Sequence, residues 1–338
     1  MRVGVFSSKS YDRELLARTN RDLGAPHELV FLDARLTAET ADLAAPFPAI
    51  CVFVNDHLDA GVLARIAAGG AQGGATRLVA LRCAGFNNVD LPAARQLGVT
   101  VVRVPAYSPH AVAEHTLGLV LTVIRKLHRA TNRVREGNFS LEGLLGFEIH
   151  GHTVGIVGTG QIGQTVVRLL SGFGARLLAH DPSPSPECVA LGASYVPLPE
   201  LLGEADVVTL HCPLTPATRH IIDGAALARM KRGAILVNTG RGALVDAAAL
   251  VGALKDGRLG GLALDVYEEE ERLFFEDHSG DVLQDDVFAR LLTFPNVVIT
   301  GHQAFFTAEA LQAISSTTLG NISNFEQGRP LLAPARVA

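Results

Sequence analysis

The sequence predicts an α/β protein of two domains built on parallel sheets, and three observations support this fold class. Short runs rich in Val, Ile and Leu alternate with segments whose apolar residues recur at helical spacing. The length of 338 residues corresponds to about two domains. A glycine-rich turn, Gly158–Gly163, follows one apolar run directly and opens a helical segment. This strand–turn–helix order predicts a doubly wound parallel sheet of the Rossmann type in the second domain.

The composition fits a globular protein and argues against several classes of partner. The net charge of −5, without a basic stripe, argues against nucleic acid and membrane-surface binding. The first residues begin a strand, lack a signal-peptide pattern, and no apolar run reaches membrane-spanning length, so we expect a cytoplasmic protein. The scattered cysteines show no CxxC spacing, and we expect reduced thiols and no metal site. They are Cys51, Cys83, Cys188 and Cys212.

Residues 1–101 are predicted to form a small βα domain. The segment 11–23 has helical spacing, and the glycine-rich loop 69–74 is predicted to be a surface insertion. That loop lacks the Lys-Ser or Lys-Thr pair of a phosphate-binding loop. The expected strands are Val3–Ser7, His27–Asp33, Ile50–Val54, Leu78–Leu81 and Val99–Val104.

The segment Arg82–Asp90 directly follows a predicted strand. In open α/β sheets, ligands bind at the carboxyl ends of the strands, so this segment is a candidate binding loop. The alternative, a plain turn rich in Gly and Asn, remains open at this point.

A long helix is predicted after Ser108, which caps it, with Pro109 at its first position. Its apolar residues continue to Leu127, and it lies where the two predicted domains join. His110, Glu114 and His115 within it could suggest a metal site. Because no third ligand is in view, a satisfied polar pair is the favoured interpretation.

The glycine turn has the spacing of a dinucleotide-binding βαβ unit. Gly158 permits a tight turn, Gly160 leaves room for a pyrophosphate, and Gly163 lets the helix approach the strand. The free N–H groups of the helix start would face the phosphates. The next strand ends at Asp181, about 20 residues after the turn, where a carboxylate binds the adenosine ribose and disfavours a 2′-phosphate. NAD is therefore predicted over NADP.

Each later strand of this domain ends in a polar or glycine-rich turn, and all these turns are expected at one edge of the sheet. Among them, Arg241 could grip a carboxylate bidentately, and His302 could protonate a carbonyl oxygen near neutral pH. One carboxylate of Glu268–Glu271 could hold the imidazole and favour its charged form. Taken singly, each residue is more commonly a surface ion pair, a solvated face or a satisfied polar group. The turns are His211–Thr215, Thr239–Gly242, Asp265–Tyr267 and Gly301–Gln303.

Taken together, these turns resemble the D-2-hydroxyacid dehydrogenase family, and within it the fermentative NAD-dependent D-lactate dehydrogenases of bacteria. The resemblance covers nearly the whole chain and is far more specific than the glycine turn alone. Its segments are Arg82–Asp90, Val104–Pro109, Asn138–Gly143, Leu210–Thr215, Asp265–Glu268, Leu273–Asp277, Gln284–Phe288 and Gly301–Phe305.

The resemblance implies a set of site residues. It assigns catalysis to Arg241, Glu270 and His302, and it selects Glu270 from four acidic candidates that physical reasoning left open. The implied substrate contacts are Cys83, Ala84, Gly85, Tyr107, Arg241, His302 and Phe305. The implied NAD contacts are Gly158, Gly160, Gln161, Ile162, Gly163, Asp181, Cys212, Pro213, Thr218, Thr239, Gly240, Arg241 and Asp265. One departure is Gly240, where relatives commonly have Ser.

The resemblance also implies the domain organisation and the reaction. Residues 102–301 would bind NAD, and residues 1–101 with 302–338 would form a flavodoxin-like substrate domain. The cleft between them would close over pyruvate, which NADH would reduce to D-lactate with His302 as the acid. A larger 2-oxo acid such as phenylpyruvate, or a non-catalytic NAD-sensing scaffold, are the alternatives. A homo-oligomer is expected because the long helix exposes apolar segments.

Overall fold

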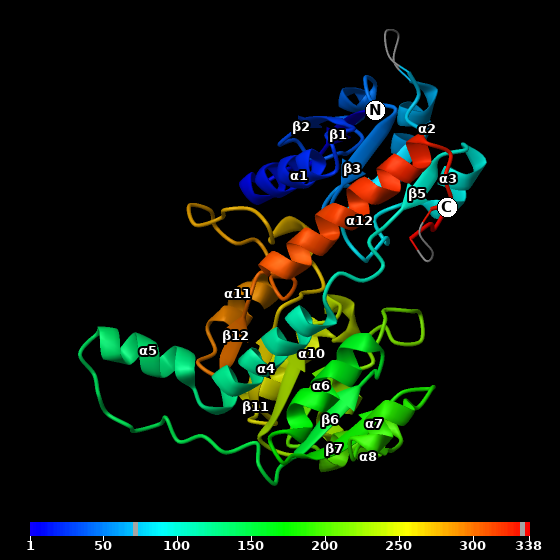
Figure 1. Cartoon of the computed structure of the whole chain (residues 1–338). Helices are drawn as coiled ribbons and strands as arrows, with labels where there is room; N and C mark the ends of the chain where they lie inside the picture. Colours follow the sequence, from blue (N-terminus) through cyan, green and yellow to red (C-terminus); the bar gives the residue numbers. More distant parts are fainter. Residues whose placement is uncertain (70–73, 332–334) are drawn as a thin grey trace. The chain divides into compact units, whose positions relative to one another are not determined.

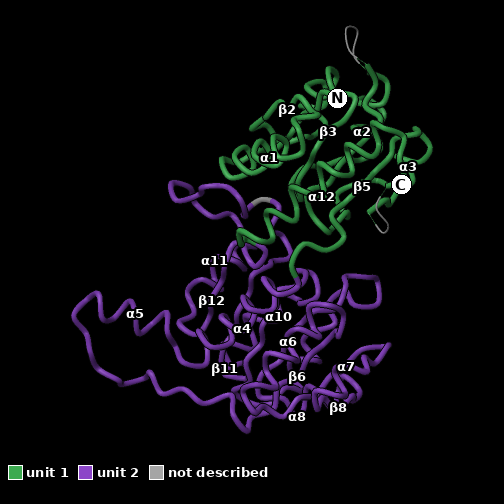
Figure 2. The backbone as a smooth tube through the Cα atoms, viewed as in Figure 1, with its two compact units in different colours: residues 1–108, 306–338 green, residues 109–305 purple. Residues whose placement is uncertain are grey.

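The computed structural model describes residues 1–69, 74–331 and 335–338. The chain divides into two compact units, coloured separately in Figure 2. Unit 1 comprises Met1–Ser108 and Phe306–Ala338, and unit 2 comprises Pro109–Phe305. The predicted α/β class with two parallel-sheet domains is confirmed. Positions 70–73 of the glycine-rich loop lie outside the described residues.

Unit 1 contains a five-stranded parallel sheet in the order β2-β1-β3-β4-β5, which is the flavodoxin-like order. Its third and fourth strands are buried along their whole length, as expected for a parallel sheet covered on both faces. The strands are β1 (Arg2–Val5), β2 (Glu28–Phe31), β3 (Ala49–Val52), β4 (Leu78–Leu81) and β5 (Thr100–Val102). The helices are α1 (Ser10–Asp22), η1 (Ala41–Ala44), α2 (Ala60–Ala68), α3 (Leu91–Gln96) and α12 (Ala308–Glu326).

The C-terminal helix α12 completes unit 1. It packs beside α1 and against β4, as Figure 1 shows for the red and blue helices. Its Leu319 and Ile322 are buried in the same apolar core as Val3 and Val5 of β1. The last residues also pair with β5, because Val337 N–H donates to Val101 O at 2.9 Å. The chain therefore returns to its first domain after unit 2.

Unit 2 contains a seven-stranded parallel sheet in the order β12-β11-β10-β9-β6-β7-β8. The strand order reverses between β6 and β9, which are neighbours in the sheet although β7 and β8 separate them in sequence. Ligands of doubly wound sheets bind at such a reversal. The strands are β6 (Thr153–Val157), β7 (Arg176–His180), β8 (Ser194–Tyr195), β9 (Val207–Leu210), β10 (Ala234–Asn238), β11 (Leu259–Leu264) and β12 (Val297–Ile299).

Helices of unit 2 pack against this sheet around two apolar cores. Helix α4 packs on α6 and over β10 and β11, so it covers the middle of the sheet. The helices are α4 (Pro109–Ile124), α5 (Leu127–Arg135), α6 (Gln161–Ser171), α7 (Pro186–Ala190), α8 (Leu198–Glu204), α9 (Gly224–Arg229), η2 (Gly242–Leu244), α10 (Ala247–Lys255), η3 (Glu270–Arg272) and α11 (Asp286–Leu292).

The long helix predicted after Ser108 is shorter than expected. Helix α4 ends at Ile124, and Lys126 takes a left-handed conformation with φ of +53°. The returning chain crosses this end closely, since a Cβ at Gly146 would lie 2.2 Å from Ile124 O. Lys126 Nζ also donates to Gly143 O at 3.0 Å. Leu127 therefore opens the separate helix α5, which lies away from the sheet in Figure 1.

Three further predictions concern the cysteines, membrane-spanning helices and metal sites. All four cysteines are free. Among the described residues, no helix is long and apolar enough to cross a membrane. No cluster of three or more His, Cys, Asp or Glu side chains within the described part of the chain is arranged to hold a metal ion.

Candidate active site

The turn after β10 presents Arg241, and the buried Asn238 shapes it. The Asn238 side chain accepts from Gly240 N–H at 3.0 Å and donates to Arg241 O at 2.8 Å. The Arg241 guanidinium donates to Gly240 O at 2.8 Å. Two hydrogen bonds of one buried amide therefore define the turn, and Gly240 lies inside it. Sequence reasoning did not single out Asn238.

Gly242 lets this turn approach the neighbouring one. A Cβ at Gly242 would lie 2.1 Å from the carbonyl carbon of Tyr267 and 2.4 Å from Glu268 N. Real Cβ atoms do not come so close to backbone, so the two turns could not pack this way with a larger residue. A glycine is therefore needed directly after Arg241, because Gly242 lets the Arg241 turn lie against the backbone of Tyr267 and Glu268.

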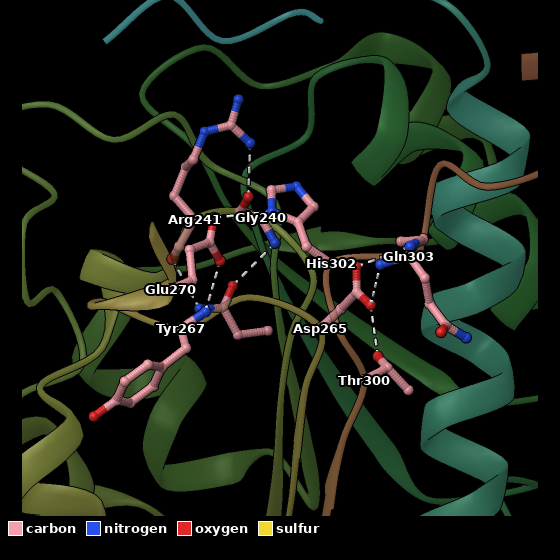
Figure 3. A network of polar contacts seen from close by, with 10 residues as sticks. Gly240, Arg241, Asp265, Tyr267, Glu270, Thr300, His302 and Gln303 are labelled. Atoms are coloured by element: carbon pink, nitrogen blue, oxygen red, sulfur yellow. Dashed lines mark hydrogen bonds and ion pairs between the residues drawn. The ribbon is translucent and has the colours of Figure 1, made fainter. Parts of the chain in front are cut away.

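Glu270 is the acidic residue that pairs with His302. Its Oε1 lies 2.8 Å from His302 Nδ1, and its Oε2 accepts from Tyr267 N–H at 2.9 Å. Glu270 and His302 are both largely buried. With Nδ1 engaged, Nε2 is the ring nitrogen left to act on a ligand. Figure 3 shows the His302 ring and the Arg241 side chain extending from their turns in the same direction.

Asp265 holds the turn that carries His302. It is fully buried at the end of β11, and its carboxylate accepts from Thr300 Oγ1 at 2.5 Å and from Gln303 and Ala304 N–H at 2.9 Å. Its carbonyl accepts from His302 N–H at 2.7 Å. Burial alone would raise the pKa of Asp265, but the hydrogen bonds outweigh it and hold the pKa below its usual range.

The backbone at His302 is left-handed, with φ of +52°. A residue other than glycine adopts this conformation only when its surroundings impose it, and such positions cluster at functional sites. The hydrogen bonds to Asp265 impose it here. Aromatic rings flank the imidazole, with Phe275 at 5.7 Å and Phe305 at 6.5 Å between ring centroids.

His115 supports the same turn from helix α4. Its Nε2 lies 3.2 Å from Thr300 Oγ1 and 3.3 Å from Asp265 Oδ1. His115 is therefore part of a hydrogen-bonded polar group, as the favoured interpretation of His110, Glu114 and His115 predicts. Neither His115 nor Thr300 was expected at the site. In the sequence, Thr300 is only a polar residue at the end of a strand and His115 only a polar residue on a helix. Nothing in the sequence indicates that these two side chains form a hydrogen bond.

The glycine turn lies where the strand order reverses. Gly158 has φ of +94°, and a Cβ there would lie 2.4 Å from Cys212 N. A Cβ at Gly163 would lie 2.0 Å from Gly158 O, whereas a Cβ at Gly160 would meet open space. The first and third glycines thus permit close packing, and the second faces free volume. This is the arrangement a dinucleotide pyrophosphate needs at the start of α6, where Gln161 and Ile162 follow.

Asp181 follows β7 and also braces the glycine turn. Its carboxylate accepts from Thr159 N–H at 2.7 Å and from Ser183 N–H at 2.8 Å. Thr159 is held in turn by Tyr195, whose hydroxyl donates to Thr159 Oγ1 at 2.8 Å. The negative charge predicted to discriminate against a 2′-phosphate is therefore fixed beside the turn.

The segment after β9 packs against the glycine turn. His211 is half-buried there, but both of its ring nitrogens are buried and have no hydrogen-bond partner within the described structure, and desolvation lowers its pKa to about 4. Burial raises the pKa of the neighbouring Cys212 thiol to about 11, so it stays protonated. Thr218 closes the following loop by donating to Pro213 O at 2.6 Å. Thr239, after β10, meets Thr116 of α4 at 2.8 Å between hydroxyl oxygens.

The remaining predicted substrate residues lie in two places. Cys83, Ala84 and Gly85 follow β4 of unit 1. Tyr107 is half-buried and lies near the end of Met1–Ser108, the first of the two stretches of chain that form unit 1. Phe305 belongs to unit 2 and is buried beside His302. Within unit 2, the structure thus brings together Arg241, Glu270 and His302, which come from three turns of neighbouring strands.

This geometry suits the reduction of a carbonyl beside a carboxylate. A guanidinium can bind the carboxylate, and an imidazole oriented by a carboxylate can exchange a proton with the oxygen. The dinucleotide turn lies on the same edge of the same sheet, because all seven strands are parallel.

Comparison with known proteins agrees with this chemistry. Residues 117–304 match the model of the D-isomer specific 2-hydroxyacid dehydrogenase NAD-binding domain. The D-lactate dehydrogenase of Escherichia coli is 53% identical over 97% of this chain and 98% of its own length.

Solved structures give the same result. The pyruvate reductase of Chlamydomonas reinhardtii superposes with a TM-score of 0.91 at 44% identity, covering 98% of both chains. The D-lactate dehydrogenase of Aquifex aeolicus, in complex with NAD and lactic acid, has a TM-score of 0.87 at 32% identity and covers 99% of this chain and 98% of that one.

Proposed function

Because this chain belongs to the D-isomer specific 2-hydroxyacid dehydrogenase family, an NAD-dependent family of oxidoreductases, we propose that it reduces pyruvate to D-lactate. The observation that carries the proposal is the 2.8 Å pair of His302 and Glu270 beside the Arg241 turn. The D configuration of the product rests on the family. The similar proteins named above as acting on lactate or pyruvate support this substrate.

Arg241 is the proposed carboxylate-binding residue. Its guanidinium makes one bond to Gly240 O, which leaves further N–H groups for a bidentate contact. Because Asn238 and Gly242 fix the turn, the guanidinium is directed before the substrate arrives. This pre-organisation reduces the entropy lost on binding.

His302 is the proposed general acid. Glu270 orients the ring through Nδ1, so that Nε2–H donates to the keto oxygen of pyruvate, which becomes the hydroxyl of lactate. When bound, NADH supplies the hydride that adds to C2. Phe275 and Phe305 flank the imidazole and keep apolar surface around the proton-transfer step.

The residues of the glycine turn fit NAD by shape and charge. Gly160 leaves volume where the pyrophosphate would lie, and the N-terminus of α6 presents N–H groups to it. Asp181 would bind the ribose hydroxyls and repel a 2′-phosphate. Cys212, Pro213, Thr218, Thr239 and Asp265 are proposed as the remaining contacts.

The two units divide the labour in this proposal. Unit 2 contains the matched NAD-binding residues and the three catalytic side chains. Unit 1 is proposed to supply substrate contacts from Cys83, Ala84, Gly85 and Tyr107.

A cytoplasmic homo-oligomer is the proposed state of the enzyme. The segment from α5 to Leu145 exposes large apolar side chains, with Leu141 82% and Leu145 88% exposed. Exposed apolar surface of this kind is characteristic of an association surface, and a second copy of the chain is its proposed partner. Light scattering on a Phe139→Glu, Leu141→Glu variant tests this, because the assembly should dissociate while the fold is retained. An unchanged molecular mass would reject this surface.

An NADH-oxidation screen across small 2-oxo acids, with chiral analysis of the product, tests the function. The expected result is the highest kcat/KM with pyruvate and D-lactate as product. A preference for phenylpyruvate or an aliphatic homologue would keep the reaction class and change the substrate. Intact NADH binding without turnover of any 2-oxo acid would indicate a scaffold and overturn the proposal.

A further inference from the structure

The loop Cys83–Phe86 of unit 1 has all three of its first carbonyl groups occupied. Cys83 O accepts from Val104 N–H at 3.1 Å, Ala84 O accepts from Arg103 Nη1 at 2.8 Å, and Gly85 O accepts from the Cys83 thiol at 3.2 Å. In the described structure, the following N–H groups of Ala84, Gly85 and Phe86 donate to no protein acceptor. In this loop the three carbonyl oxygens are therefore bonded, whereas the three N–H groups are left as donors.

Peptide planarity connects these two observations. The C=O of one residue and the N–H of the next lie in one plane and point in opposite directions in a trans peptide. The bond from Arg103 to Ala84 O therefore fixes the direction of Gly85 N–H. A donor that binds the carbonyl also polarises the peptide and strengthens its N–H as a donor.

Arg103 is held firmly in this position. Its guanidinium lies 5.1 Å from the centroid of the Phe86 ring, and its backbone N–H donates to Ala335 O at 2.9 Å. Asn321 Nδ2 donates to its carbonyl at 3.4 Å. Among the described residues, no carboxylate forms an ion pair with Arg103, so its charge is not neutralised by a neighbouring acid.

The arginine that precedes the loop differs in this respect. Arg82 is fully buried, and it pairs with Asp12 at 3.2 Å and donates to Ser7 O at 2.8 Å. Its guanidinium lies 4.8 Å from the centroid of the Phe53 ring. Arg82 therefore anchors the start of the loop to its neighbours, and Asp12 balances its charge. Arg103 contributes an uncompensated positive charge directly behind the free N–H groups.

We propose that Arg103 is a positioning residue for substrate binding, which aims and polarises the Gly85 N–H toward the substrate carboxylate and adds a positive charge behind it. The inference rests on the proposed function, in which Ala84 and Gly85 contact that carboxylate. Arg103 acts through one peptide bond and does not touch the substrate. Arg103 favours a ligand with a negative charge. Its effect on binding therefore depends on an anionic group beside the ketone of the substrate.

The test compares two ligands that differ in this charge. Pyruvamide replaces the carboxylate of pyruvate with a neutral amide and keeps the ketone. In an Arg103→Gln variant, we expect KM for pyruvate to rise about 10- to 100-fold, as for loss of a hydrogen bond to a charged group. We expect kcat, the Kd for NADH and kcat/KM for pyruvamide to stay within about 2-fold, because hydride and proton transfer use unit 2.

Two further variants complete the experiment. Arg95→Gln is the matched control, because Arg95 also donates to a backbone carbonyl of unit 1, that of Val337 at 3.0 Å, far along the chain from the loop. It should leave KM for pyruvate unchanged. Arg103→Lys keeps the positive charge and a hydrogen-bond donor. It should recover most of the pyruvate affinity that Arg103→Gln loses, which would show that the loss does not come from a damaged fold.

The outcomes separate this inference from the proposed function. Equal losses with pyruvate and pyruvamide in Arg103→Gln would overturn the inference, because they would show general damage to the loop. An unchanged preference for pyruvate in that variant would also overturn it. If the parent enzyme itself fails to prefer pyruvate over pyruvamide, carboxylate recognition and with it the proposed function are wrong.

Discussion

The two sheets of this molecule use the same edge in different ways. Both are parallel, and in both the candidate residues follow the carboxyl ends of the strands. In unit 2 these residues are side chains with their own chemistry, Arg241, Glu270 and His302. In unit 1 they are backbone N–H groups of the loop Cys83–Phe86, one of which Arg103 is proposed to direct through its bond to Ala84 O. A fold that delivers turns to one edge can therefore supply either reactive side chains or a shaped backbone.

This contrast predicts that single substitutions in unit 2 affect turnover strongly, whereas those in unit 1 affect affinity moderately. His302→Ala should cause the largest loss, about 10²- to 10⁴-fold in kcat for pyruvate reduction. The loss arises because the substitution removes the imidazole that Glu270 orients through Nδ1. Steady-state kinetics at saturating NADH measures it. Turnover near that of the parent would remove His302 from the mechanism and end the contrast.

Arg241→Lys should reduce kcat/KM for pyruvate by about 10²-fold, since a Lys ammonium cannot make the bidentate contact. The Kd for NADH, followed by fluorescence titration, should change far less. Arg258→Lys serves as a control, because Arg258 also donates to a backbone carbonyl of unit 2, that of Met230. An unchanged kcat/KM in Arg241→Lys would reassign the carboxylate to another group.

His211 should make unit 2 sensitive to acid. Its pKa is lowered to about 4 in the folded chain from 6.5, so the unfolded chain binds more protons between these pH values. The free energy of unfolding should therefore fall as pH decreases from 6.5 to 4, by about 3 kcal/mol in total from this group. Denaturant titrations of the parent and of His211→Leu measure it, with the exposed His57→Asn as control. Identical pH slopes in parent and His211→Leu would exclude this linkage.

Cys83→Ala should have the smallest effect. It removes the thiol that donates to Gly85 O, a weak donor at 3.2 Å, so KM for pyruvate should rise about 2- to 5-fold with kcat unchanged. Progress curves at several pyruvate concentrations provide both constants. A fall in kcat as large as that of His302→Ala would mean that unit 1 supplies chemistry and not shape.

The helices and strands were predicted from the sequence better than the hydrogen bonds between distant segments. The strand Leu78–Leu81 has the predicted bounds, because a buried parallel strand is a continuous apolar run. The choice of Glu270 among four acids came from family resemblance. The bond to His302 Nδ1 depends on how two turns meet, and no local pattern contains that information.

Residues that support others were the hardest to foresee. Asn238, Thr300 and His115 fix the turns of Arg241 and His302 through hydrogen bonds between segments distant in sequence. The end of α4 at Ile124 was also missed, because its apolar spacing continues and the crossing chain at Gly146 ends it. Tertiary contacts decided each of these cases.

The left-handed backbone at His302 sets stability against activity at a single position. An L residue there costs about 1–2 kcal/mol relative to its ordinary conformation, and glycine would avoid most of that cost. Selection for a more stable chain would therefore favour glycine at the position where the proposed mechanism needs an imidazole. If His302 is the proposed general acid, a screen for thermostability alone should recover inactive variants at this position.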